Sequence, residues 1–158
     1  MQISFQCECA IRAADDINRG NAFYGVQNFL VAVANISKAL WAGGGSNAAG
    51  RKELRDALGL TDQSPLNDVD MRNFYEHFDK ELFKWANDPN RSGLIDLNAC
   101  HIDGIDPAKM LRSYDPATKT AVFAGQVFSV KSALEEIYRI FPAVQREFLI
   151  PPWEKVKK

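Results

Sequence analysis

Arg72 and His77 are the residues whose types and spacing are best suited to chemistry. They begin and end the segment Arg72-Asn73-Phe74-Tyr75-Glu76-His77, and His77 is one of only 2 histidines in the chain. Histidine titrates near neutral pH and can move protons, whereas arginine is permanently charged and can hold a phosphate. With Asn73 to orient a neighbour, the segment has the groups that metal-free cleavage of a phosphodiester requires.

A single helix over about 70–87 is expected to position these residues. Its apolar residues recur at helical steps: Met71, Phe74, Tyr75, Phe78, Leu82 and Trp85. On such a helix Asn73 and His77 share one face, but Arg72 and His77 point about 140° apart. A composite site therefore needs two copies of the chain facing each other across a two-fold axis. Asp68 or Asp70 can cap the helix, and the backbone N–H groups near Arg72 favour a phosphate.

The surrounding pattern predicts a mainly α protein. Helices are expected over about 3–18, 22–42, 47–58 and 131–148, and Pro142 should kink or restart the last one. Two short strands, 109–114 and 119–123, flank the turn sequence Asp115-Pro116-Ala117-Thr118. The predicted fold is an up-and-down bundle of four to five helices with a small β-hairpin inserted before the last helix. We expect one domain, 1–150, and a short Pro/Lys-rich tail, 151–158.

The composition narrows the classes of function. The chain has 158 residues, 46% hydrophobic and 25% charged, as in an ordinary soluble domain. A net charge of −1 argues against general coating of nucleic acid, and it is compatible with a small electropositive pocket. No apolar run is long enough to span a membrane, and the first residues do not form a signal peptide. The odd count of 3 cysteines indicates a reducing cytoplasm, and we interpret Cys7, Cys9 and Cys100 as structural.

The motif at the head of a bundle helix resembles the HEPN superfamily of helical domains. The resemblance is carried by the segment 72–82, and the Tyr114-Asp115-Pro116 turn followed by Phe123-Ala124-Gly125 is also similar to uncharacterised bacterial HEPN-like chains. It implies a bundle of four or five helices that forms a homodimer and places the motif at the dimer cleft. Many members are metal-independent ribonucleases of toxin–antitoxin, CRISPR and abortive-infection systems.

The resemblance also implies roles for individual residues. Arg72 would hold the scissile phosphate, His77 would be the general acid or base, and Asn73 would fill the polar position after the arginine. No cofactor and no metal is implied. The expected partners are a second copy of the chain, RNA and an antitoxin or other protein.

A non-catalytic interpretation stays open beside this one. Many HEPN-like proteins bind ligands or partners or serve as dimeric scaffolds, so the chain can equally be a dimerisation or protein-interaction module. His77 can then be a helix-surface residue that pairs with Glu81, and Arg72 can pair with Glu76 in the same way. Catalysis requires Arg72 and His77 to be exposed in one cleft, whereas the module does not.

Two further sets of residues are given structural interpretations. The spacing of the polar residues at 96–106, which include His101, does not match a calcium-binding loop, so we expect a solvated loop there. The large aromatics are expected in the core rather than on a base-stacking platform. They are Phe5, Phe23, Tyr24, Phe29, Trp41, Phe74, Phe78, Trp85 and Phe141.

Overall fold

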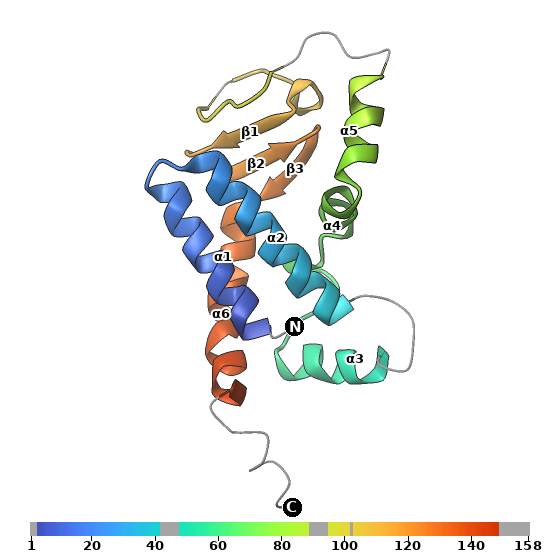
Figure 1. Ribbon diagram of the computed structural model, residues 1–158. Coiled ribbons are helices and arrows are strands. Elements are labelled where there is room, and N and C mark those ends of the chain that lie inside the picture. Colours follow the sequence, from blue (N-terminus) through green and yellow to red (C-terminus); the bar gives the residue numbers. More distant parts are fainter. Residues whose placement is uncertain (1–2, 42–47, 89–94, 102, 149–158) are drawn as a thin grey trace, which may run out of the picture.

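The computed structural model describes residues 3–41, 48–88, 95–101 and 103–148, and its elements follow the predicted order (Figure 1). The helices are α1 (Ile3–Asn18), α2 (Ala22–Trp41), α3 (Ala48–Ala57), α4 (Val69–Glu76), α5 (Phe78–Ala86) and α6 (Val130–Phe148), and the strands are β1 (Arg112–Asp115), β2 (Thr120–Phe123) and β3 (Gln126–Ser129). Short 3₁₀ turns lie at Pro65–Asn67 and Pro107–Lys109. The mainly helical fold with a small antiparallel sheet before the last helix is confirmed. The tail at 151–158 lies outside the described residues.

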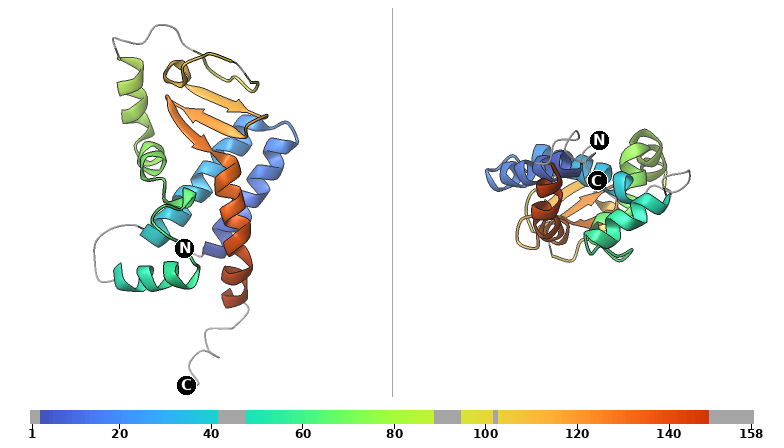
Figure 2. Two further views of the ribbon diagram at one scale, coloured as in Figure 1. Left: turned by 180° about the vertical axis from the view of Figure 1, so that it is seen from behind. Right: turned by 90° about the horizontal axis from the view of Figure 1, so that it is seen from below.

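The main core lies between the α1–α2 hairpin and α6, which runs alongside the pair (Figures 1 and 2). The helix α2 buries Phe29, Leu30 and Ile36, each at 1% exposure or less. Each such side chain stabilises the fold by about 1.5–3 kcal/mol through removal of apolar area from water. Gly25 allows the close approach of the two helices, because a Cβ there would lie 2.6 Å from Ile17 Cγ1 and 2.8 Å from the Ala13 carbonyl oxygen.

The three strands form an antiparallel sheet in the order β1-β2-β3. Tyr114, Ala121 and Phe128 lie opposite one another in register, and all three are buried. The Phe128 ring packs 6.3 Å from that of Phe29 in α2, so one face of the sheet joins the helical core. The predicted hairpin is therefore confirmed, and β3 extends it by a strand that the sequence pattern did not indicate.

One predicted helix is in fact two. The helix expected over about 70–87 is interrupted at His77, whose backbone angles of φ −122° and ψ 35° end α4 and precede α5. The interruption lets Phe74 and Trp85 form a second, smaller core with Ala124. The Phe74 ring meets Phe123 edge-on at 5.3 Å, and Trp85 Nε1 donates a hydrogen bond of 3.1 Å to the Ala108 carbonyl. These partners lie far away in sequence, so helical periodicity cannot reveal the break.

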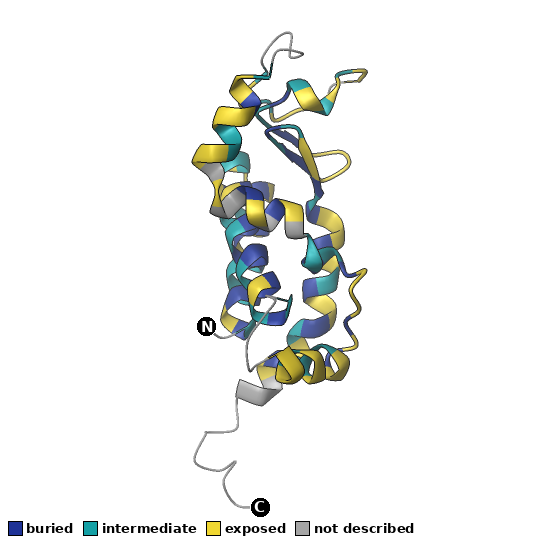
Figure 3. Cartoon of the chain, turned by 90° about the vertical axis from the view of Figure 1, so that its right-hand side faces the viewer, coloured by how far each residue is buried: buried dark blue, intermediate teal, exposed yellow. Residues whose placement is uncertain are grey.

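Several local expectations are corrected or refined. Phe5 and Tyr24 are not in the core, because their exposed fractions are 56% and 66%. The helix α6 runs through Pro142 without a restart. Buried and exposed positions alternate along the helices, and α3 contributes no buried residue (Figure 3). No described helix has the length and the apolar character that crossing a membrane requires.

Candidate functional site

His77 lies at the junction of α4 and α5, and its residue is exposed. Its backbone continues the helical hydrogen bonding: its N–H donates to the Asn73 carbonyl at 3.0 Å, and its carbonyl accepts from the Glu81 N–H at 2.9 Å. The imidazole makes no capping hydrogen bond to the start of α5. The junction thus holds the His77 main chain firmly while its side chain is exposed to solvent.

Asn73 and Arg72 both belong to α4 but differ in what the structure describes. Asn73 is exposed and lies one helical turn before His77. Arg72 is the fourth residue of α4, and its side chain lies outside the described part of the structure. The structure therefore brings Asn73 and His77 onto neighbouring turns, and the position of the Arg72 guanidinium stays a prediction.

The start of α4 has its own acidic groups. Of the two caps that the sequence allowed, Asp68 is the one used: its carboxylate accepts the Met71 N–H at 2.8 Å, and Asp70 adds a second acid in the first turn. These carboxylates already occupy and offset the positive end of the helix dipole. A phosphate bound near α4 therefore depends on the Arg72 side chain rather than on the helix terminus.

The expected pairing of His77 with Glu81 is not what the structure shows. Glu81 Oε1 instead forms an ion pair of 2.6 Å with Lys84 Nζ on the next turn of α5. Among the described residues, no side chain forms a recorded hydrogen bond or ion pair with the His77 ring. The corresponding Arg72–Glu76 pair lies outside the described side chains. Glu81 therefore does not supply the ion pair that was expected for His77.

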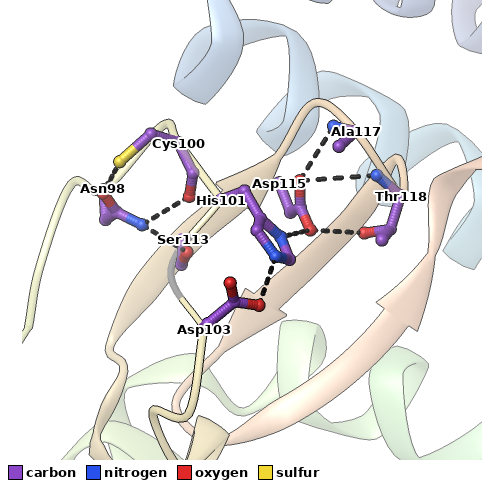
Figure 4. Close-up of polar contacts among 8 residues, drawn as sticks. All are labelled: Asn98, Cys100, His101, Asp103, Ser113, Asp115, Ala117 and Thr118. Carbon is purple, nitrogen blue, oxygen red and sulfur yellow. Dashed lines mark hydrogen bonds and ion pairs between the residues drawn. The ribbon is translucent and has the colours of Figure 1, made fainter.

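The other histidine has very different surroundings (Figure 4). His101 Nδ1 lies 2.7 Å from Asp115 Oδ2, and its Nε2 lies 2.7 Å from Asp103 Oδ1. These hydrogen bonds, first to Asp115 and then to Asp103, raise the pKa of His101 above its ordinary value of 6.5. The same contact with His101 is the main cause that lowers the pKa of Asp115 to about 2. With a carboxylate facing each ring nitrogen, His101 is stabilised as a cation.

The region around His101 is an exposed loop, as expected from the sequence, and hydrogen bonds and an ion pair tie it to β1. Asn98 forms an isolated parallel β-bridge with Ser113 of β1, and its carbonyl accepts a hydrogen bond of 2.8 Å from the Tyr114 N–H. A two-pronged ion pair fixes the same segment, since Arg112 Nε and Nη2 donate to the two Asp96 carboxylate oxygens at 2.8 and 2.6 Å. The sequence signal that was missed is the charge match between this loop and β1. Within the described residues, no group of three or more His, Cys, Asp or Glu side chains is placed to hold a metal.

Burial gives Cys7 the structural role expected for it. All three are free thiols, and Cys7 is fully buried. Burial raises the pKa of the Cys7 thiol to about 12, which keeps it protonated and unreactive. Cys100 is exposed, and its Sγ donates a hydrogen bond of 2.8 Å to Asn98 Oδ1.

None of the described cavities is lined by Arg72, Asn73 or His77, although a cavity of about 360 Å³ borders Asp68 at the start of α4. One of about 410 Å³ is a groove along α1 and α2, bordered by Phe5, Arg12 and Tyr24. Another, of about 330 Å³, lies between α2 and the sheet. No protein-family model, curated protein or solved structure matches this chain. A functional interpretation therefore depends on the residues themselves and on the resemblance of the motif.

Proposed function

We propose that this chain is a HEPN-like protein of the bacterial cytoplasm that cleaves RNA without a metal, as a homodimer, through Arg72, Asn73 and His77. One observation carries the proposal. The His77 residue is exposed at a fixed junction between two helices, one turn after the exposed Asn73, and no described carboxylate neutralises its ring. A group that transfers protons must be free to contact its substrate, and His77, unlike His101, has no recorded partner among the described side chains.

The proposed reaction uses the RNA's own 2′-hydroxyl as the nucleophile. The 2′-oxygen attacks the adjacent phosphorus while His77 accepts the hydroxyl proton, and the bond from phosphorus to the 5′-oxygen breaks. The partner's His77, in its protonated form, supplies a proton to that leaving oxygen. Arg72 stabilises the negative charge that develops on the phosphate. The products are a 2′,3′-cyclic phosphate and a 5′-hydroxyl, and DNA is excluded because it lacks the 2′-hydroxyl.

The resemblance to HEPN dimers is the reason for including a second protomer. His77 lies at the junction after α4, where its φ of −122° and ψ of 35° leave the helix, so the spacing of five residues does not fix its direction relative to Arg72. Two copies related by a two-fold axis let the arginine of one chain face the histidine of the other. This arrangement also provides two imidazoles, one as base and one as acid.

The decisive test is RNA cleavage in the presence of EDTA. The purified protein is incubated with a mixed RNA pool and, separately, with the matching DNA, beside the variants Arg72→Ala and His77→Ala. We expect the parent to cut RNA only and to leave cyclic phosphate ends, and both variants to be inactive. Cleavage by His77→Ala at the parental rate would refute the catalytic role. A monomer in sedimentation at micromolar concentration would refute the composite site.

A second candidate, a protein-interaction module, is favoured by a separate observation. The groove along α1 and α2 is bordered by Phe5 and Tyr24, which are large aromatic residues with exposed fractions of 56% and 66%. Exposed aromatics at a groove are typical of protein-binding surfaces. If the parent cuts no RNA, this candidate predicts that Phe5→Ser with Tyr24→Ser abolishes self-association, while Arg72→Ala and His77→Ala leave it unchanged.

A further inference from the structure

We propose that the cavity between the start of α2 and the sheet binds a small carboxylate with an aromatic or branched apolar body. The cavity has a volume of about 330 Å³ and is lined by residues of α2, β1 and β2. That volume falls at the lower end of the range for small-molecule sites. None of its lining residues belongs to the motif at 72–77, so the inference is independent of the proposed ribonuclease.

The walls of the cavity are apolar on both sides. Phe23 and Val26 line it from α2, and Val122 and Phe123 line it from β2. Phe23, Val26 and Phe123 are buried or half-buried in the free chain, so the rings and methyl groups are already in place before a ligand arrives. A flat or branched apolar body matches such a slot, because it fills the space without leaving a polar group unpaired.

Three polar residues line the cavity, Gln27, Arg112 and Ser113, and the first two carry side-chain N–H donors. Arg112 is the cross-strand partner of Phe123, so the two side chains stand on the same face of the sheet. Gln27 lies on α2 across the cavity and is exposed. Both side chains present N–H donors, and an acceptor group on the ligand therefore suits this end of the cavity.

The chemistry of Arg112 identifies the acceptor as a carboxylate. Asp96 occupies the edge of the guanidinium formed by Nε and Nη2. A guanidinium has five N–H donors in a planar fork, so the edge that includes Nη1 keeps donors that have no recorded partner among the described residues. The contact with Asp96 fixes the plane of the fork and so prepares the second edge for a two-pronged contact. Carboxylates make such contacts with arginine more strongly than neutral carbonyls do.

The test uses benzoate as the probe and benzyl alcohol as its uncharged match. Each compound is titrated to about 20 mM into the full-length protein while backbone amide shifts are followed by NMR. We expect saturable benzoate binding with Kd of roughly 1 mM, with the shifts centred on Phe23, Gln27 and Phe123. Benzyl alcohol should bind about tenfold more weakly.

Variants locate the binding site. Gln27→Trp places a large ring at the mouth of the cavity from an exposed position and should weaken benzoate binding by about tenfold or more, whereas Gln63→Trp, at an exposed position outside the cavity, should not. Arg112→Gln should remove the preference for benzoate over benzyl alcohol. The proposal is overturned by unsaturable or scattered shifts, by equal binding of the two probes to the parent, or by benzoate binding that Gln27→Trp leaves unchanged.

Discussion

The two histidines of this chain have different surroundings: one is exposed at a helix junction, and the other is held between two carboxylates. His77 lies between α4 and α5, is exposed, and has no recorded side-chain partner among the described residues. His101 lies on a loop beside β1, where carboxylates of Asp103 and Asp115 face its two ring nitrogens at 2.7 Å each (Figure 4). A histidine stabilised as a cation is a weak base, so the surroundings of His101 suit it to pinning the loop.

The largest expected effect is on the rate of RNA cleavage, which His77 should control and His101 should not. His77→Ala should lower RNA cleavage by about 10²–10⁴-fold, as loss of a general acid–base group does, whereas His101→Ala should leave the rate within about twofold. The measurement is the initial rate on one RNA substrate for both variants and the parent. Equal losses in the two variants would show that His77 contributes no more to the rate than the loop histidine does, and would count against its role in catalysis.

For the motif at 72–77, the sequence pattern predicted the local relations between residues but not the contacts with distant parts of the chain. Spacing alone placed Asn73 and His77 on neighbouring turns and limited the cap to Asp68 or Asp70, because these relations are local. The break at His77 was not predicted, since it depends on Phe74 and Trp85 packing against residues beyond position 100. The cluster around His101 was missed for the same reason: its partner Asp115 lies 14 residues away.

The sheet shows a second limit. The turn at 115–118 was predicted because Asp and Pro favour turns, and the Asp115 carboxylate indeed accepts the Ala117 N–H at 2.8 Å. The turn before β3 places Ala124 at φ 46° and Gly125 at φ 83°. Alanine seldom adopts a positive φ, so Ala124 does not indicate a turn in the sequence. For this reason β3, which follows the turn, was not predicted. A Cβ at position 125 would meet Ala108 Cα at 3.2 Å, which links the turn to the second core.

The next largest effect concerns the anchoring of α5, which begins directly after His77. Trp85→Ala removes a buried ring and should destabilise the second core by about 3–5 kcal/mol. Trp85→Phe keeps a ring but loses the hydrogen bond to the Ala108 carbonyl, and it should cost about 1–2 kcal/mol. Amide hydrogen exchange measures this directly, with faster exchange in α5 than in α1 or α2. Uniform acceleration across all helices would mean that α5 and the main core form one cooperative unit.

A smaller expected effect is on the pH dependence of folding stability, to which the His101–Asp115 pair contributes. The folded pKa of His101 is raised, so its contribution is fully present below 6.5 and is lost as the pH rises through the folded value. The folded pKa of Asp115 is lowered from 3.8 to about 2, so its contribution is present above 3.8 and is lost as the pH falls through about 2. Asp115→Asn should therefore lower the melting temperature most near pH 5 and progressively less at alkaline pH. A difference from the parent that does not change between about pH 5 and pH 9 would show that the turn contacts, rather than the ion pair, set the effect.

The smallest expected effect is the difference between Asp115 and Asp103 in how far each raises the pKa of His101. The side chain of Asp115 is 19% exposed and is also bound by Thr118, whereas that of Asp103 is 94% exposed. An exposed carboxylate is screened by water and keeps its freedom of motion, so its contact is the weaker one. Asp115→Asn should therefore lower the pKa of His101 further than Asp103→Asn does, as followed by NMR of the imidazole ring protons across the titration. If Asp103→Asn had the larger effect, the exposed Asp103 of the loop, rather than Asp115 of β1, would be the main partner of His101. The difference between His101 and His77 would then depend on a solvent-exposed contact and not on the sheet.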